Sequence, residues 1–64
     1  MKKFYIARNT IAVTLPGPKK KVLAIWEKHK DEAIREDQVR GQQAVYQLCL
    51  EEGNINPTVV MELN

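Results

Sequence analysis

The spacing of apolar residues changes along the chain, and the first pattern predicts a β-strand at residues 10–15. Polar or small residues alternate strictly with large aliphatic ones there, which is typical of a strand with one buried face. The apolar face consists of Ile11, Val13 and Leu15. The opposite face, which stays available for contacts, consists of Thr10, Ala12 and Thr14. We therefore expect one side of this segment to pack against the core.

A helical pattern follows Pro18, which suits the first position of a helix. Apolar residues now recur at spacings of three and four, so one stripe of this helix should be buried. The stripe consists of Val22, Ile25, Trp26 and His29. It stops at Arg35-Glu36-Asp37, where an inward face would have to bury charge, and we expect a turn there.

A second helix is predicted after this turn. Asp37 is a suitable N-cap, and Gly53 is well placed to end the helix. The expected inner face consists of Gly41, Ala44, Val45, Leu48 and Cys49. A glycine inside a helix costs about 1 kcal/mol relative to alanine, so Gly41 is interpreted as a place of close helix approach.

Two shorter segments complete the expected fold. Residues 4–6 form either a strand that folds back through a turn at Arg8-Asn9 or a flexible arm. Residues 58–63 have strand character after a turn at Asn56-Pro57 and are a candidate partner for the N-terminal strand. The patterns together predict one α+β domain over residues 1–64, with an N-terminal strand or hairpin, two helices and a short C-terminal strand.

The length of 64 residues limits how the domain is stabilised. A chain of this size hides only about 60% of its unfolded surface, and small domains often add disulfides, metals or a second subunit. Cys49 is the single cysteine and His29 the single histidine, so we expect neither a disulfide nor a metal or other cofactor. A homodimer is then the remaining route to a larger core.

A single thiol within an apolar stretch and the lack of a signal peptide or membrane span indicate a cytoplasmic protein.

Charge is distributed unevenly between the two halves. Residues 1–30 hold eight lysines and arginines against one glutamate, whereas residues 31–64 hold two arginines against seven carboxylates. Such asymmetry suggests that the basic half binds a polyanion. The alternative is that basic and acidic faces attract each other within the fold or across a dimer.

The most informative charges are Lys19, Lys20 and Lys21 at the start of the first predicted helix. The positive end of a helix dipole favours anions, so an external phosphate would explain lysines at this position. A solvated lysine run that limits aggregation is the alternative.

The sequence contains no nucleophile elbow, phosphate-binding glycine loop, zinc-binding helix motif or paired-carboxylate site, and we do not expect an enzyme.

An alternating strand that ends in Leu15-Pro16, followed by a helix with a Val22-Leu23-x-Ile25-Trp26 core and a second helix, resembles the ribbon-helix-helix family of Arc/MetJ-type repressors over residues 10–52. The resemblance implies a dimer in which strands from two chains pair and their outward side chains enter the major groove of DNA. It assigns the groove contacts to Thr10, Ala12 and Thr14.

The sequence thus yields two functional hypotheses. The first is a small protein that binds double-stranded DNA, a transcriptional repressor or accessory factor of a bacterial mobile element, which contacts phosphates with a basic strand and helix start. Its expected DNA-binding residues are Arg8, Thr10, Ala12, Thr14, Lys19, Lys20 and Lys21. The second is a small inhibitor or interaction module that binds another protein through a strand edge or an acidic helix face.

Overall fold

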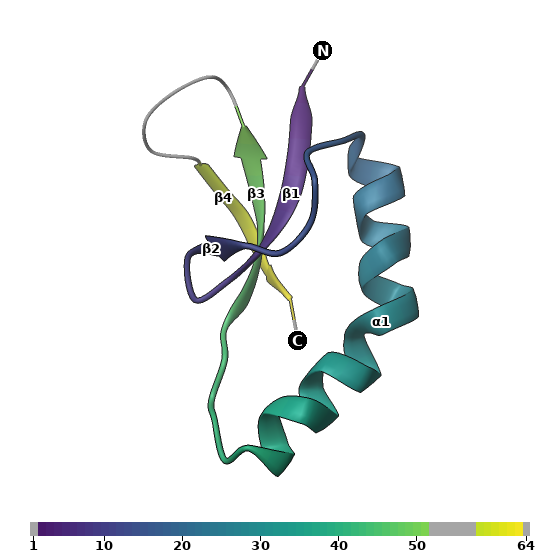
Figure 1. Cartoon of the computed structure of the whole chain (residues 1–64). Coiled ribbons are helices and arrows are strands. Elements are labelled where there is room, and N and C mark those ends of the chain that lie inside the picture. The colour runs from purple at the N-terminus through teal and green to yellow at the C-terminus, as the bar shows by residue number, and fades with distance from the viewer. Residues whose placement is uncertain (1, 52–57, 64) are drawn as a thin grey trace.

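Four antiparallel strands and one helix make up residues 2–51 and 58–63, the part of the chain that the computed structural model describes. In chain order the elements are β1 (Lys3–Arg8), β2 (Ile11–Ala12), α1 (Lys19–Val39), β3 (Tyr46–Glu51) and β4 (Thr58–Leu63). The strands form a single sheet in the order β2-β1-β3-β4, and α1 lies along one side of it (Figure 1). The predicted arrangement of two helices with an N-terminal and a C-terminal strand is therefore wrong.

The first two strands form a hairpin. Asn9 and Thr10 make a two-residue turn in which both residues have positive φ, at 50° and 71°, a geometry whose twist suits a hairpin. Residues 4–6 are thus part of a strand rather than an arm. Of the predicted strand at residues 10–15, only Ile11–Ala12 is regular β-structure. Its apolar side is not buried, since Ile11, Val13 and Leu15 are 69%, 52% and 87% exposed.

The chain after β2 continues along the outer edge of β1 as far as Gly17. Val13 donates a backbone hydrogen bond to Ile6, and the Ile6 N–H donates to the Thr14 hydroxyl oxygen at 2.9 Å. Phe4 and Gly17 then exchange two backbone hydrogen bonds of 2.7 and 2.9 Å. These bonds bring the start of α1 next to the start of β1.

α1 begins at Lys19, one residue after the predicted first position at Pro18, which is instead the N-cap, and it is longer than predicted. Val22 and Trp26 are buried, whereas Ile25 and His29 are exposed, so only half of the expected stripe faces the core. The predicted turn at Arg35-Glu36-Asp37 is wrong because the helix continues through these residues. The inward carboxylate of Asp37 is tolerated there because Arg8 reaches it from β1.

The predicted second helix is replaced by a loop and β3. Gly41 has a φ of 67° and follows the end of α1, so it terminates a helix rather than lying inside one. β3 is a central strand, paired with β1 on one side and β4 on the other, and its side chains alternate between the two faces of the sheet. The predicted helix end at Gly53 and the turn at Asn56-Pro57 lie outside the described residues.

The strand predicted at residues 58–63 is confirmed as β4, but its partner is β3 and not the N-terminal strand. Ile11–Ala12 pairs with β1 of its own chain. A ribbon-helix-helix fold needs a second helix where this chain forms β3. The resemblance over residues 10–52 therefore does not extend to the fold.

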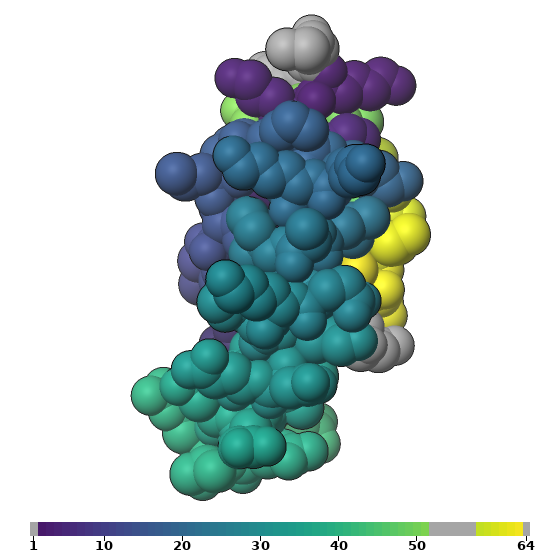
Figure 2. Space-filling view, turned by 90° about the vertical axis from the view of Figure 1, so that its right-hand side faces the viewer, coloured from purple at the N-terminus to yellow at the C-terminus, as the bar shows by residue number. Residues whose placement is uncertain are grey.

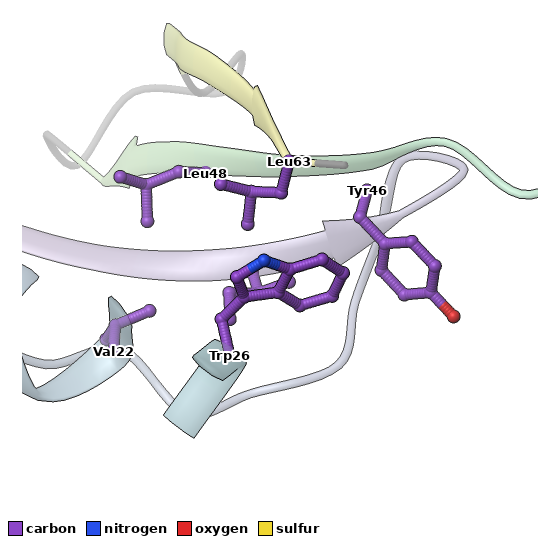
Figure 3. Packing of buried hydrophobic residues seen from close by; sticks show 6 residues of the cluster. Val22, Trp26, Tyr46, Leu48 and Leu63 are labelled. Atoms are coloured by element: carbon purple, nitrogen blue, oxygen red, sulfur yellow. The ribbon is translucent and has the colours of Figure 1, made fainter. Parts of the chain in front are cut away.

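The core lies between α1 and one face of the sheet. Its buried members are Ile6, Val22, Trp26, Tyr46, Leu48 and Leu63. The indole of Trp26 lies beside the ring of Tyr46, with ring centroids 4.8 Å apart (Figure 3). Such a tilted aromatic pair contributes about 0.5–1.5 kcal/mol beyond the area that it buries. This pair anchors the middle of α1 to β3.

Candidate functional site

Five lysines gather at one end of the molecule. Lys2 and Lys3 lie at the start of β1, and Lys19, Lys20 and Lys21 form the first turn of α1. The paired backbones of Phe4 and Gly17 bring these two runs together, although sixteen or more positions separate them in sequence. β1 and α1 begin at the same end in both views of the molecule (Figures 1 and 2). All five are exposed residues, with Lys3 on the sheet face opposite α1 because it alternates with Phe4, and we call these five lysines the basic end.

The start of α1 adds to the positive potential of the basic end. Pro18 makes no side-chain capping bond, and the first turn contains no acidic residue. The free N–H groups and the helix dipole therefore keep their partial positive charge beside three ammonium groups. One opposing carboxylate is near, because Glu51 pairs with Lys3 across the β1–β3 ladder. The basic end is consequently a suitable surface for a phosphate-bearing ligand.

Arg8, another predicted DNA-binding residue, bonds within the fold. Its Nη2 donates to Asp37 Oδ1 at 2.6 Å and to Gln42 Oε1 at 3.0 Å. The hydroxyl of Tyr46 donates to the other oxygen of the same carboxylate, Oδ2, at 2.8 Å. β1, β3 and the last turns of α1 are thus joined through one carboxylate, and we call Arg8, Asp37, Gln42 and Tyr46 the helix-end cluster.

The helix-end cluster changes the acidity of its members. Hydrogen bonds from Arg8 and then from Tyr46 hold the pKa of Asp37 below its ordinary value of 3.8. Burial raises the pKa of Tyr46 above 10.0, and its hydrogen bond to Asp37 raises it further. Asp37 is therefore a carboxylate and Tyr46 a neutral phenol at neutral pH. Their bonds hold the fold together and leave no group ready for proton transfer.

The remaining predicted contact residues lie away from the basic end. Thr10 occupies the hairpin turn and Ala12 lies in β2, both at the opposite end of β1 from Lys3. The hydroxyl oxygen of Thr14 accepts a hydrogen bond from the backbone of Ile6. The seven residues that the sequence singled out thus do not form one surface. Only Lys19, Lys20 and Lys21 stay together, and the fold adds Lys2 and Lys3 to them.

A shallow apolar groove of about 270 Å³ separates α1 from the chain that follows β2. The groove is lined by Ile6, Arg8, Val13, Thr14, Ile25, Trp26, His29, Ala33 and Tyr46. Its walls are mostly aliphatic and aromatic, so it is unsuited to a phosphate. Residues 2–51 and 58–63 contain no group of three or more His, Cys, Asp or Glu residues that could hold a metal ion.

Sequence reasoning identified the lysines at the helix start but missed how they combine with the N-terminal ones. Their proximity depends on a backbone bridge between Phe4 and Gly17, and nothing in the local pattern of either residue indicates this bridge. It also missed the role of Asp37 and Tyr46. The available signal was the alternation of Tyr46, Leu48 and Leu50 with Gln47, Cys49 and Glu51, which indicates a strand.

Within residues 2–51 and 58–63, no helix combines the length and apolar character needed to cross a membrane. Comparison of the chain with protein-family models, curated proteins and solved structures gives no match.

Proposed function

We propose that this protein is a non-enzymatic, cytoplasmic DNA-binding protein that holds double-stranded DNA by its phosphates at the basic end. The observation that carries the proposal is the gathering of Lys2 and Lys3 with Lys19, Lys20 and Lys21 by the Phe4–Gly17 bridge. Contacts from lysine to phosphate provide affinity without sequence readout. The proposed role is thus a sequence-tolerant accessory factor or repressor, with binding that depends strongly on salt.

The test is a titration of a fluorescent duplex, followed by anisotropy, at a series of salt concentrations. Each phosphate neutralised contributes about 0.9 to the slope of log affinity against log salt. Replacing Lys19, Lys20 and Lys21 together with alanine should therefore reduce that slope by up to about 2.7 and weaken binding.

A matched control removes the same charge from the rest of α1 and its C-cap residue Arg40. Lys28, Arg35 and Arg40 are exposed residues that lie outside the basic end, and their triple alanine variant also loses three positive charges. It should keep most of the wild-type slope if phosphate contacts at the basic end matter more than net charge. Equal losses in the two triple variants, or no duplex binding by the wild type at low salt, would rule out the proposed site.

Binding of another protein is the second candidate function. The observation in its favour is the row Ile11, Val13 and Leu15, whose side chains are exposed, and Val13 also lines the apolar groove. Exposed apolar rows of this kind commonly mark interaction surfaces. The titration separates the two functions, because a protein-binding module should show no salt-dependent affinity for a duplex. If the protein binds another protein instead, Leu15→Ser should weaken partner binding, whereas the lysine variants should not change it.

A further inference from the structure

β4 forms an edge of the sheet, and nothing in residues 2–51 or 58–63 pairs with its outer side. Natural proteins protect such edges by making them short or by adding lysine, proline or an irregularity. The opposite edge, β2, follows this rule because it has only two residues. β4 has six residues, contains neither lysine nor proline and carries a single charge at Glu62, and its one protective feature is the register shift at Val60. It is therefore the edge that is available for another strand.

The side chains of β4 are also incompletely covered. Val59, Val60 and Met61 are 48%, 40% and 42% exposed, and they are consecutive. α1 packs against β1, on the far side of β3, and so leaves β4 uncovered along its flank. Figure 2 shows β4, in yellow, beside rather than beneath the helix. An apolar edge of this length in a small domain indicates a contact surface.

The register of β4 against β3 gives this strand a self-complementary pattern. Leu48 pairs with Met61 and Cys49 pairs with Val59, so Val60 is an extra residue at a register shift. Without the shift, Thr58 and Leu63 would face opposite sides of the sheet, because side chains alternate. With it, both face the helix side as partners of Leu50 and Tyr46.

From this pattern we propose that two copies of the chain form a dimer by antiparallel pairing of their β4 strands. A two-fold axis between Val60 and Met61 places Thr58 opposite the partner's Leu63 and Val59 opposite the partner's Glu62. The two members of each of these pairs lie on the same face of the sheet, as an antiparallel ladder requires. Glu62 meets an uncharged residue, so no like charges face each other.

The symmetry of this pairing also enlarges the contact. An antiparallel pair about an axis perpendicular to the sheet keeps both α1 helices on the same face of an eight-stranded sheet. Met61, which lies on the helix side with Leu48, then comes between the two helices. Val60 and Met61, which are 40% and 42% exposed in the single chain, become covered at the centre of this contact. The contact is isologous and closes at two copies.

The proposed dimer does not require DNA binding, but its symmetry determines where the two basic ends lie. Thr58 pairs with Leu50, which pairs with Phe4, so this end of β4 lies toward the basic end. Antiparallel pairing therefore places the two basic ends at opposite ends of the joined sheet. The oligomeric state is measured without DNA, so failure of either proposal is recognised separately.

The test is the molar mass of the purified full chain by light scattering after size exclusion, from micromolar to near-millimolar concentration. The wild type should reach the mass of a dimer. A Val60→Lys substitution places a charge at the centre of the contact and should raise the dimer Kd by about tenfold or more, because an unpaired buried charge is costly.

The matched control is Val13→Lys, the same change at a residue that is 52% exposed beside the other edge of the sheet. This variant should remain a dimer, and circular dichroism should show that both variants are folded. Met61→Lys replaces Val60→Lys if the latter does not fold. Hydrogen exchange of the wild type gives an independent reading, since amides of β4 should become more protected as concentration rises.

Three results would overturn the proposal. One is a wild type that stays monomeric over the whole concentration range. Another is a dimer that is disrupted by Val13→Lys but not by Val60→Lys, which would assign the contact to the opposite edge. The third is exchange protection in β4 that does not change with concentration.

Discussion

Within residues 2–51 and 58–63, three residues have positive backbone φ angles, and they lie at two places where the chain changes direction. Asn9 and Thr10 form the turn between β1 and β2, and Gly41 follows α1. Asn9 also accepts a hydrogen bond from the Val45 N–H through its side chain at 2.9 Å, which attaches the hairpin turn to the chain before β3. Thr10 is unusual at a φ of 71°, because β-branched residues rarely adopt this conformation.

Gly41→Ala distinguishes a glycine at a helix end from a glycine inside a helix, because the two positions predict opposite changes in stability. A Cβ at this position would meet nothing within 4 Å, but a φ of 67° is strained for any L-residue with a side chain. Gly41→Ala should therefore lower the free energy of unfolding by about 1 kcal/mol. Inside a helix the same change would raise it by a similar amount, about 1 kcal/mol.

The measurement is urea unfolding followed by circular dichroism. Gly41→Asn is a useful companion because asparagine tolerates this conformation better than alanine, so its loss of stability should be smaller. An increase in stability with Gly41→Ala would mean that residue 41 lies within a helix after all.

At the scale of elements, the last turns of α1 are held by polar contacts rather than by an apolar stripe. Val22 and Trp26 are the buried residues of the helix, and both lie in its first half. The end of the helix is fixed instead by Asp37, which receives hydrogen bonds from Arg8 and Tyr46. The stability of this segment therefore depends on two side chains that come from the sheet.

Tyr46→Phe tests this dependence by removing only the hydroxyl. The aromatic contact with Trp26 should remain, and the lost hydrogen bond should reduce the free energy of unfolding by about 0.5–1.5 kcal/mol. Amide hydrogen exchange should accelerate most in the last two turns of α1, because they lose one of their attachments to the sheet.

Tyr5→Phe is the control, since Tyr5 pairs with Cys49 on the opposite face of the sheet from the core. It should leave exchange in α1 unchanged. Uniform acceleration along the whole helix in Tyr46→Phe would contradict a local role for the hydroxyl.

At the scale of the whole molecule, charge is separated along α1. The helix starts with three lysines at the basic end, and its other end carries Asp37, which is 13% exposed and paired with Arg8. A paired carboxylate makes stability depend on pH. Because the pKa of Asp37 is lower in the folded state than its ordinary 3.8, the folded state favours the charged form. The contribution of the Arg8–Asp37 ion pair to stability is present above about pH 4 and is lost as the pH falls through the pKa of Asp37 in the folded state.

The prediction is that Asp37→Asn destabilises the protein at neutral pH and that this difference shrinks as the pH falls from about 4 through the lower pKa of Asp37 in the folded state. Thermal unfolding of both proteins between neutral and acidic pH measures it. Glu36→Gln removes a neighbouring exposed carboxylate as a control and should show a much smaller difference. If the difference in unfolding temperature between the wild type and Asp37→Asn were the same at all pH values, the ion pair would be excluded as its source.

The local pattern of the sequence determined the start of α1 to within one residue of Pro18, the burial of Val22 and Trp26, the strand at Thr58–Leu63 and the lysines of the first helical turn. Each depends on residues that are neighbours in sequence: a fixed proline φ, helical spacing or strand propensity. The tertiary structure decided the rest. Helix continues through Asp37 because Arg8, 29 positions away, pairs with it. Residues 46–51 form a strand because β1 and β4 supply hydrogen-bonding partners on both sides, and the basic end exists because Phe4 and Gly17 pair. Such contacts join distant residues, and no local spacing encodes them.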